Sequence, residues 1–428
     1  MIAPIDPKLT ALNVEIGSKM SNQPMKGIRV LEVAQFTFTP AAGAILADWG
    51  ADVIKVEHPV SGDAQRGITI GTGGASKGTF QPLMELPNRG KRSIGLALDS
   101  EDGRRILDEL IAESDVFLTN FLPSARKRLR LDVEDVRSVR PDIIYARGSA
   151  HGVHGPEADV GGYDLSTFWC RGGGAWGATP GDAHTVSMMP GGAMGDSMSG
   201  MTLAGGISAA LFARERTGET SVVDVSLLGV ACWGNSLSIG SAVLTGEDPP
   251  RTSIEGPAHV AANPTVGHFP TSDGRFINLT MLQPGRFWAD LCRHIDRPDL
   301  IEDERFNSGE KLMMNASVAG ALVESAIAEK PYTHWVQQFQ TLEGTWAPVQ
   351  SPLEVAADEQ VRANGYLVDL VDADGLAQKI VSSPVQFDEV PFDLIRAPQF
   401  AEHTDDIICE LGYDTESLLR LKFDGVIT

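Results

Sequence analysis

One carboxylate lies where a glycine-rich loop turns into a helix. Asp196 stands in the run Gly195-Asp196-Ser197, and apolar residues at helical spacing follow from 197 to 216. A carboxylate in the first turn of a helix faces unpaired N–H groups and the positive end of the helix dipole, which favour its ionised form. The nearby glycines allow a substrate to approach its oxygens closely. Asp196 is therefore a candidate nucleophile, and a simple helix N-cap is the alternative interpretation.

The other reactive side chains suggest no second site. Four cysteines lie far apart without a CxxC pair, which predicts reduced thiols rather than a zinc site or a disulfide framework. The nine histidines are scattered, and His151 with His154 forms only a weak i, i+3 pair in a glycine-rich loop. We therefore expect no bound metal.

The composition is that of a folded, strongly acidic protein. Of 428 residues, 42% are hydrophobic and 21% are charged, and the formal net charge is -22. This charge repels polyanions, so we expect no nucleic-acid partner. Residues 1–22 lack the apolar core of a signal peptide, and no run of about 18 apolar residues occurs. The sequence therefore predicts a soluble, cytoplasmic protein with no membrane partner.

The elements that would position Asp196 alternate between strands and helices. A buried strand is expected at 27–33, further strands at 52–57, 93–98, 115–119, 142–147 and 221–226, and helices at 40–49 and 101–113. Such alternation predicts an α/β domain, in which helices cover both faces of a parallel sheet. Its first βα loop lacks the GxGxxG of a nicotinamide dehydrogenase, so we set that interpretation aside.

The residue composition changes at two places along the chain. From 148 to 195, glycines and prolines form a loop-rich segment, of the kind that carries binding or chemistry beside a sheet. From about 247 to 350, the hairpin signal Ser272-Asp273-Gly274 and several amphipathic helices predict a smaller α+β domain. Two structural units are also the usual expectation for a chain of this length.

Short segments spread along the chain form a specific combination. They are KGIRVLE at 26–32, DWGADVIKVE at 48–57, NRGKRSIGLAL at 88–98, Asn120-Phe121, GDSMSG at 195–200, Arg396-Ala397-Pro398 and Glu402-His403-Thr404. Together they resemble the class III CoA-transferases, which include formyl-CoA:oxalate and carnitine CoA-transferases and are related to α-methylacyl-CoA racemase. The resemblance covers nearly the whole chain from residue 26.

The resemblance implies a fold and a domain layout. The family has a large Rossmann-like domain with a parallel sheet, a smaller α+β domain, and two chains threaded through one another as an interlocked homodimer. For this chain, the expected parts are an N-terminal extension at 1–25, a large CoA-binding domain at 26–226, a linker helix at 227–246, a small domain at 247–350, a return linker at 351–394 and a C-terminal part of the large domain at 395–428.

It also implies a covalent role for Asp196. In the family, the matching aspartate attacks an acyl-CoA thioester and forms a mixed anhydride, which releases the CoA thiolate. The thiolate then forms an aspartyl-CoA thioester, from which CoA passes to an acceptor acid. The expected activity is therefore transfer of CoA from an acyl-CoA to a free carboxylic acid, with coenzyme A as a substrate.

Residues 163 and 164 help to distinguish a CoA-transferase from the alternative functions. Asp164 matches an active-site acid of the transferases, and capping of a helix at 165–170 is the competing account. Related racemases carry a proton-shuttling His where Tyr163 stands, and a phenol is a poor base near neutral pH. An acyl-CoA racemase, epimerase or isomerase is therefore the runner-up. In a non-catalytic CoA-binding protein, a less favoured alternative, Asp196 would only cap its helix.

Further site residues follow from the same resemblance. Gln35 matches an active-site position on the first βα loop, as does Thr37. Guanidinium and ammonium groups suit phosphates by charge and hydrogen-bond geometry. The residues expected around coenzyme A are His58, Lys91, Arg92, Asn120, Phe121, Arg126, Arg128 and Tyr163.

Two departures from the oxalate-using branch bear on the substrate. That branch has a glycine-run loop in its small domain, whereas residues 253–266 contain only Gly256, and its His and Gln on the first βα loop are replaced by Gln35 and Thr37. Both differences favour an acyl group larger than formyl or oxalyl. Aromatic residues that could pack such a group, although each also suits a core, are Phe36, Phe38, Phe168 and Trp169.

Overall fold

Two compact units make up the chain. The computed structural model describes residues 23–68, 78–260 and 262–428, so the predicted extension at 1–25 lies almost wholly outside the described residues. The larger unit contains the described residues up to Ala178, together with Ser187–Pro249 and Glu359–Thr428. The smaller unit contains Thr179–Val186 and Pro250–Asp358. The chain thus leaves the larger unit twice and returns to it twice.

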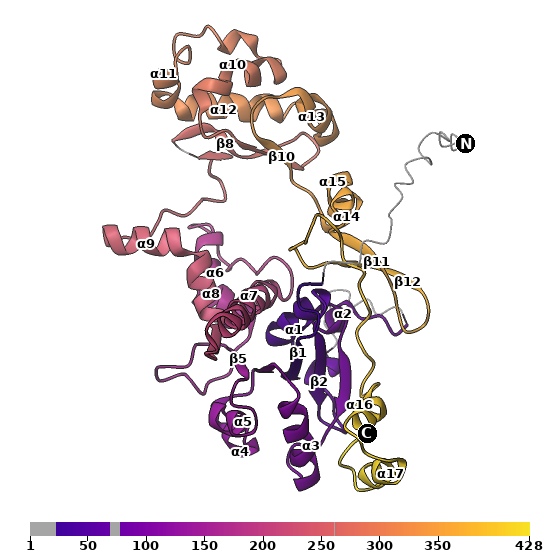
Figure 1. Ribbon diagram of the computed structural model, residues 1–428. Helices are drawn as coiled ribbons and strands as arrows, with labels where there is room; N and C mark the ends of the chain where they lie inside the picture. Colours follow the sequence, from indigo (N-terminus) through magenta and orange to yellow (C-terminus); the bar gives the residue numbers. More distant parts are fainter. Residues whose placement is uncertain (1–22, 69–77, 261) are drawn as a thin grey trace, which may run out of the picture. The chain divides into compact units, whose positions relative to one another are not determined.

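A six-stranded, fully parallel sheet forms the centre of the larger unit (Figure 1). Its order is β3-β2-β1-β4-β5-β6, so the direction of winding reverses between β1 and β4, as in Rossmann-type folds. The predicted α/β class and parallel sheet are confirmed. The strands are Arg29–Val33 (β1), Asp52–Glu57 (β2), Arg92–Gly95 (β3), Val116–Thr119 (β4), Ile144–Ser149 (β5) and Val222–Ser226 (β6).

Helices cover both faces of this sheet. Val30 and Leu31 are fully buried but belong to different cores, because successive strand residues point to opposite faces. On the Val30 face pack α1 (Phe38–Asp48) and α7 (Met194–Thr217). On the Leu31 face pack α3 (Glu101–Ala112), α5 (Val133–Val139), α16 (Thr404–Glu410) and α17 (Thr415–Phe423). Burial on both faces explains the apolar runs of β1 to β5, whereas β6, at the edge of the sheet, is only partly buried.

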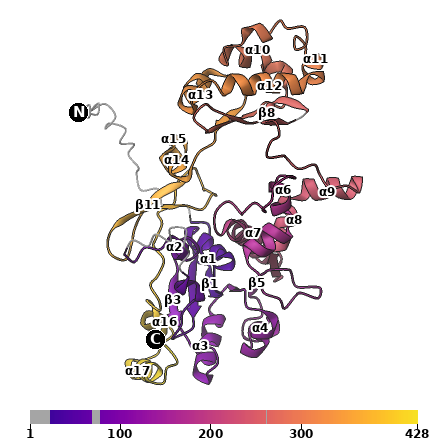
Figure 2. The same ribbon diagram turned by 180° about the vertical axis from the view of Figure 1, so that it is seen from behind.

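The C-terminal helices pack against the sheet formed by the N-terminal half of the chain. α16 lies beside β3 (Figure 2), where the His403 amide donates to the Ser93 carbonyl oxygen at 2.9 Å. Other elements of this unit are α2 (Pro82–Asn88), α4 (Pro123–Leu129), the π-helical η3 (Asp164–Arg171), α6 (Gly174–Ala178), α8 (Leu227–Gly234), α9 (Ser236–Thr245), α15 (Glu359–Ala363), β11 (Leu367–Val371), β12 (Ala377–Val381) and the short 3-10 turn η2 (Ala64–Gly67).

The smaller unit pairs an antiparallel sheet with helices. Its strand order is β10-β9-β8-β7, and the predicted hairpin at Ser272-Asp273-Gly274 joins β8 to β9. Trp288, Trp335 and Phe339 lie in its separate core. The elements are β7 (His259–Val260), β8 (Asn263–Pro270), β9 (Phe276–Thr280), β10 (Trp346–Pro348), α10 (Pro284–His294), α11 (Gly309–Met314), α12 (Ala316–Ile327), α13 (Tyr332–Gln338), α14 (Pro352–Ala357) and the 3-10 turns η4 (Pro298–Leu300) and η5 (Phe339–Thr341).

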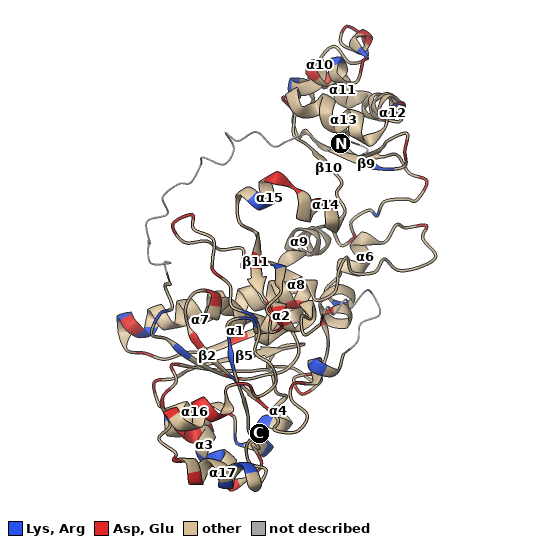
Figure 3. Ribbon diagram, turned by 90° about the vertical axis from the view of Figure 1, so that its right-hand side faces the viewer, with Lys and Arg blue, Asp and Glu red and all other residues tan. Residues whose placement is uncertain are grey.

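The helices α8 and α9 carry no charged residue (Figure 3). Four of their apolar side chains are more than 80% exposed: Trp233, Leu237, Val243 and Leu244. Within residues 23–68, 78–260 and 262–428, no single helix has the length and apolar character needed to cross a membrane; α8 and α9 reach both only as a pair, bent by 71° at their junction.

Candidate active site

The carboxylate of Asp196 lies in the first turn of α7, as the sequence predicts. Ala193, just before this helix, adopts a left-handed backbone conformation with φ 62°. Such a conformation is unfavourable for a residue with a Cβ, and strained residues of this kind concentrate at functional sites. α7 begins at Met194, three residues before the predicted start, so Asp196 is inside the helix rather than capping it.

Two glycines bring this turn close to its neighbours. A Cβ on Gly195 would lie 2.5 Å from Cγ of Phe168 in η3, and one on Gly200 would lie 2.7 Å from Cβ of Ala41 in α1. Real side chains do not approach this closely, so both positions need glycine. The close contacts fix the start of α7 against η3 and α1, and with it the position of Asp196.

Burial dominates the electrostatics of Asp196. Burial, and then the charge of Asp164, raise the pKa of Asp196 to about 7. The expectation that the helix N-terminus favours the ionised form is therefore outweighed. Asp164 begins η3 and its Oδ1 accepts the Leu165 amide at 2.7 Å. Burial raises the pKa of Asp164 as well, despite backbone hydrogen bonds from Leu165 and Ala193. Both carboxyl groups thus have a raised pKa, and the charge of Asp164 contributes to the raised pKa of Asp196.

Asp196 faces a cavity of about 720 Å³ in the larger unit. Residues just beyond the carboxyl ends of β1, β4 and β5 line it, and β1 and β4 flank the point where the strand order reverses. Open α/β sheets bind ligands at that point. The lining includes Phe36, Phe38, Asn120, Phe121, Leu122, Arg126, Arg147, Ser149, Val153, Val160, Tyr163, Asp196 and Leu227. The cavity therefore combines two acids, Asp159 and Asp196, two guanidinium groups and a mostly apolar wall.

The loop between β1 and α1 forms one wall of this cavity. The backbone amide of Gln35 donates to Asn120 Oδ1 at 3.0 Å, and Asn120 Nδ2 donates to the Gln35 carbonyl oxygen at 2.7 Å. This pair of bonds joins the ends of β1 and β4 across the reversal point. The Phe36 ring meets the Tyr163 ring edge-to-face, with centroids 5.5 Å apart. The wall is therefore tied both to β4 and to the segment before η3.

The structure brings together only some of the predicted site residues. Asp196, Asn120, Phe121, Arg126 and Tyr163 line the cavity, and Asp164 lies close enough to raise the pKa of Asp196. The two guanidinium groups of the lining already have partners. Arg126 donates to Asp132 and to the Phe121 carbonyl oxygen, and Arg147 pairs with Asp224.

Other predicted residues lie outside this lining. Lys91 is fully buried, and its ammonium group pairs with Glu32 at 2.7 Å, so no phosphate can reach it. Arg92 pairs with Asp52 and Glu410, each at 2.7 Å. The remaining three are Gln35, whose backbone binds Asn120, and the exposed residues His58 and Arg128. Burial corrects the assignment of Lys91 to the coenzyme, whereas the assignment of Arg92, whose side chain is partly exposed, stays a prediction.

Sequence reasoning missed part of the lining. Arg147 and Ser149 end β5, and Leu227 begins α8. The position of Arg147 near the carboxyl end of a predicted parallel strand was an available signal. Leu227 offered none, because it reads as an ordinary helix residue. No cluster of three or more potential metal-ligating side chains occurs in the part of the chain that the structure describes.

Comparison with known proteins then decides the family. Residues 25–404 match the CoA-transferase family III. The chain belongs to this family. It is therefore an enzyme of the CoA-transferase family III type, and the resemblance seen in the sequence is confirmed.

Similar proteins match nearly the whole length of this chain. The cinnamoyl-CoA:phenyllactate CoA-transferase of Clostridium sporogenes is 32% identical, over 93% of this chain and 96% of its own length. The (R)-2-hydroxy-4-methylpentanoate CoA-transferase of Clostridioides difficile is 29% identical, over 94% of this chain and 99% of its own. A CAIB/BAIF family protein from Brucella suis has a similar structure, with a TM-score of 0.77 and 27% identity, covering 91% of this chain and all of that one.

Proposed function

We propose that this family III enzyme moves CoA from an acyl-CoA to a free carboxylic acid through covalent intermediates on Asp196. One observation carries the proposal: the Asp196 carboxylate, held at the start of α7, faces a cavity at the ligand-binding edge of the sheet. The relatives named above are CoA-transferases by name, which supports the same reaction class.

The chemical steps balance without another reactant. The ionised Asp196 carboxylate attacks the thioester carbonyl carbon, the C–S bond breaks, and CoA leaves as a thiolate while an acyl-aspartyl anhydride forms. The thiolate attacks the aspartyl carbonyl of the anhydride and expels the donor acid as its carboxylate. The acceptor carboxylate then attacks the aspartyl-CoA thioester, expels the CoA thiolate and forms a second anhydride. The thiolate attacks the acceptor carbonyl of this anhydride, which gives the new acyl-CoA and frees Asp196 as its carboxylate. An activated acyl bond, either thioester or anhydride, is thus kept at each step.

Asp164 is proposed to act by its charge and position. Its carboxyl group lies close enough to Asp196 to raise the pKa of that residue. Gln35 is proposed to support the reacting centre, since its backbone is fixed to Asn120 on both the donor and the acceptor side. For coenzyme A, we retain the cavity residues Asn120, Phe121, Arg126 and Tyr163 as contacts, with the exposed His58 and Arg128 as outer candidates.

The apolar part of the wall favours a bulky, apolar acyl group. Phe36, Phe38, Leu122, Val153 and Val160 line the cavity, whereas formyl or oxalyl groups offer little surface to pack against them. Relatives named for cinnamoyl-CoA, phenyllactate and 2-hydroxy-4-methylpentanoate support this size class. Phe168 instead belongs to the core under α7, as its burial shows.

Trapping of the intermediate tests the proposal. We expect incubation with cinnamoyl-CoA followed by hydroxylamine to convert Asp196 into a hydroxamate, which mass spectrometry of the peptide would locate. The Asp196→Asn chain should give no adduct and should lose roughly a thousandfold or more in transfer rate. Full transfer by that variant would remove the basis of the mechanism. A racemase, epimerase or isomerase would instead exchange the α-proton of its substrate in deuterated water without an acceptor acid.

We further propose a cytoplasmic homodimer with interlocked chains. The uncharged helices α8 and α9, with four largely exposed apolar side chains, are the surface that supports an interface. A monomer by light scattering at micromolar concentration would contradict the dimer.

A further inference from the structure

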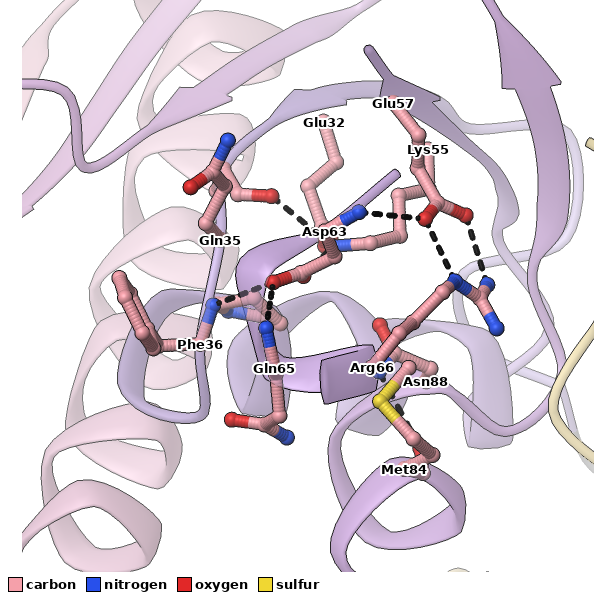
Figure 4. A network of polar contacts seen from close by, with 12 residues as sticks. Glu32, Gln35, Phe36, Lys55, Glu57, Asp63, Gln65, Arg66, Met84 and Asn88 are labelled. Carbon is pink, nitrogen blue, oxygen red and sulfur yellow. Dashed lines mark hydrogen bonds and ion pairs between the residues drawn. The ribbon is translucent and has the colours of Figure 1, made fainter. Parts of the chain in front are cut away.

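Six charged side chains form a largely buried cluster next to the loop between β1 and α1, and all of them except Lys91 are labelled in Figure 4. Lys55 Nζ lies 3.1 Å from Glu32 Oε1 and 2.8 Å from Asp63 Oδ2. The Asp63 amide donates to Glu57 Oε2 at 2.9 Å, which joins the second half of the cluster to the first. The carboxylates are Glu32, Glu57 and Asp63, and the cations are Lys55, Arg66 and Lys91.

The cluster has no part in the transfer steps proposed above. Lys55, Glu32, Asp63 and Lys91 are completely buried at their side chains, where no substrate can reach them. Buried charges are costly to desolvate, and apolar residues of the same volume are often as stable. The backbone groups that the cluster binds therefore indicate its role.

Three members of the cluster bind the backbone of the β1–α1 segment. Lys55 Nζ donates to the Ala34 carbonyl oxygen at 2.9 Å, and Lys91 Nζ donates to that of Pro40 at 2.8 Å. Between them, the Phe36 amide donates to Asp63 Oδ1 at 3.1 Å. The segment that forms one wall of the cavity is thus held at its start, middle and end by buried charges.

The middle bond falls on a strained residue. Phe36 has φ 66°, in the left-handed region that residues with a Cβ avoid. Asp63 Oδ1 also accepts the Gln65 amide at 2.9 Å, and Gln65 Oε1 accepts the Thr37 hydroxyl at 2.8 Å. Two successive residues of the loop are therefore bound to the turn at 63–65. This conformation directs the Phe36 ring against Tyr163 in the cavity wall.

We infer that Asp63 is a positioning residue: backed by Lys55, it holds Phe36 in its left-handed conformation and so sets the Phe36–Tyr163 wall of the substrate cavity. The inference rests on the proposed function only in taking this cavity as the substrate site. Asp63 itself touches no reacting group. Its loss should therefore weaken substrate binding more than it slows the chemical step.

A double-mutant cycle with Phe36 tests this role. We expect Asp63→Ala to raise KM for cinnamoyl-CoA roughly tenfold, with a smaller change in kcat, and Asp63→Asn, which keeps an oxygen acceptor, to restore part of the loss. In a Phe36→Gly background, where the ring is absent and the backbone is unstrained, Asp63→Ala should change KM less than about twofold. An equal factor in both backgrounds would overturn the inference.

The control is a second buried carboxylate in the same unit. Asp48, at the far end of α1 from the β1–α1 loop, is paired with Arg89 at 2.6 Å, and its side chain is 2% exposed. Asp48→Ala should lower the melting temperature as Asp63→Ala does, and leave KM unchanged. Equal KM effects of the two variants would show that Asp63 acts only through general stability.

A second readout needs no substrate. Hydrogen exchange of the peptide containing Phe36 should become faster in Asp63→Ala and remain unchanged in Asp48→Ala. If a charge-removing variant does not fold, Thr37→Val, which removes only the neutral bond to Gln65, should raise both the exchange rate and KM. Unchanged exchange in Asp63→Ala, or in Thr37→Val when Asp63→Ala does not fold, would contradict the inference, whereas absent CoA transfer by the unaltered chain would contradict the proposed function alone.

Discussion

Asp196 illustrates a conflict between two physical effects on one carboxyl group. A helix N-terminus stabilises its charge, while burial and the neighbouring Asp164 oppose ionisation and raise its pKa to about 7. A carboxylate that is poorly solvated is a better nucleophile than one surrounded by water, provided that it is ionised. The site therefore favours reaction near or above neutral pH.

The rate of acyl transfer to Asp196 should accordingly depend on pH. Only the ionised carboxylate attacks the thioester, so the single-turnover rate should rise with pH and level off above about 7, the raised pKa of Asp196. Rapid-quench measurement of adduct formation between pH 5 and 9 checks this. A rate that is already at its plateau at pH 5 would contradict it.

Replacement of Asp164 should shift that profile. The charge of Asp164 raises the pKa of Asp196, although less than burial does, so Asp164→Asn should move the acid limb to lower pH. The matched control is Asp108→Asn on α3, which removes an acid paired with Arg104 and should leave the limb in place. A limb that does not move in Asp164→Asn would show that the two acids are not coupled.

The same raised pKa makes the unreacted enzyme less stable at high pH. A carboxyl group with a raised folded-state pKa contributes stability at low pH that is lost as pH rises from about 4 to about 7. Asp196→Asn cannot ionise, so it should raise the free energy of unfolding at pH 8 by roughly 1–3 kcal/mol, and by less at pH 5. Urea unfolding at the two pH values measures the difference, and a destabilised variant at pH 8 would refute it.

At the scale of elements, close packing of α7 positions the nucleophile. The glycines of the GDSMSG segment allow this helix to approach η3 and α1, as the contacts of Gly195 and Gly200 show. A third glycine in the same helix, Gly205, has open space around its Cβ position. The helix therefore contains both required and dispensable glycines.

Two alanine substitutions separate these cases. Gly195→Ala should destabilise the protein by about 1–3 kcal/mol and reduce transfer, because its Cβ would collide with Phe168. Gly205→Ala should be stabilising by up to about 1 kcal/mol, through better helix propensity alone. Denaturant unfolding and initial rates of both variants provide the comparison, and similar behaviour of the two would disprove the packing argument.

Sequence patterns predicted the positions of the strands and helices more accurately than they predicted the tertiary contacts of individual side chains. The apolar-rich run at 52–57 becomes β2, which is buried on both faces, whereas the run at 221–226 becomes β6, a partly exposed strand at the edge of the sheet. The location of Asp196 in the first turn of a helix could be predicted from a local signal, the transition from a glycine-rich loop to a helix. The burial of Lys91 did not, because its partner Glu32 is distant in sequence and a basic doublet usually lies on the surface. The raised pKa of Asp196 likewise depends on tertiary burial.

At the scale of the whole molecule, the exposed face of α8 and α9 should hold two chains together. Leu237→Glu combined with Leu244→Glu should increase the monomer fraction, because both side chains are more than 80% exposed in the single chain. Phe423→Glu, at an equally exposed position on α17, is the control and should leave the mass unchanged. Light scattering at micromolar concentration measures both, and an unaffected dimer in the double variant would exclude this face.

The packing of α16 and α17 against the N-terminal sheet also has a consequence for folding during protein synthesis. Ile407, Ile408 and Leu421 complete the core on the Leu31 face, yet they follow β6 by roughly 200 residues. At ordinary rates of protein synthesis, the ribosome needs about 10–40 s to add this length. Throughout that interval, the Leu31 face of the nascent sheet exposes hydrophobic side chains to solvent. We therefore expect the growing polypeptide to depend on chaperones until its last helices emerge.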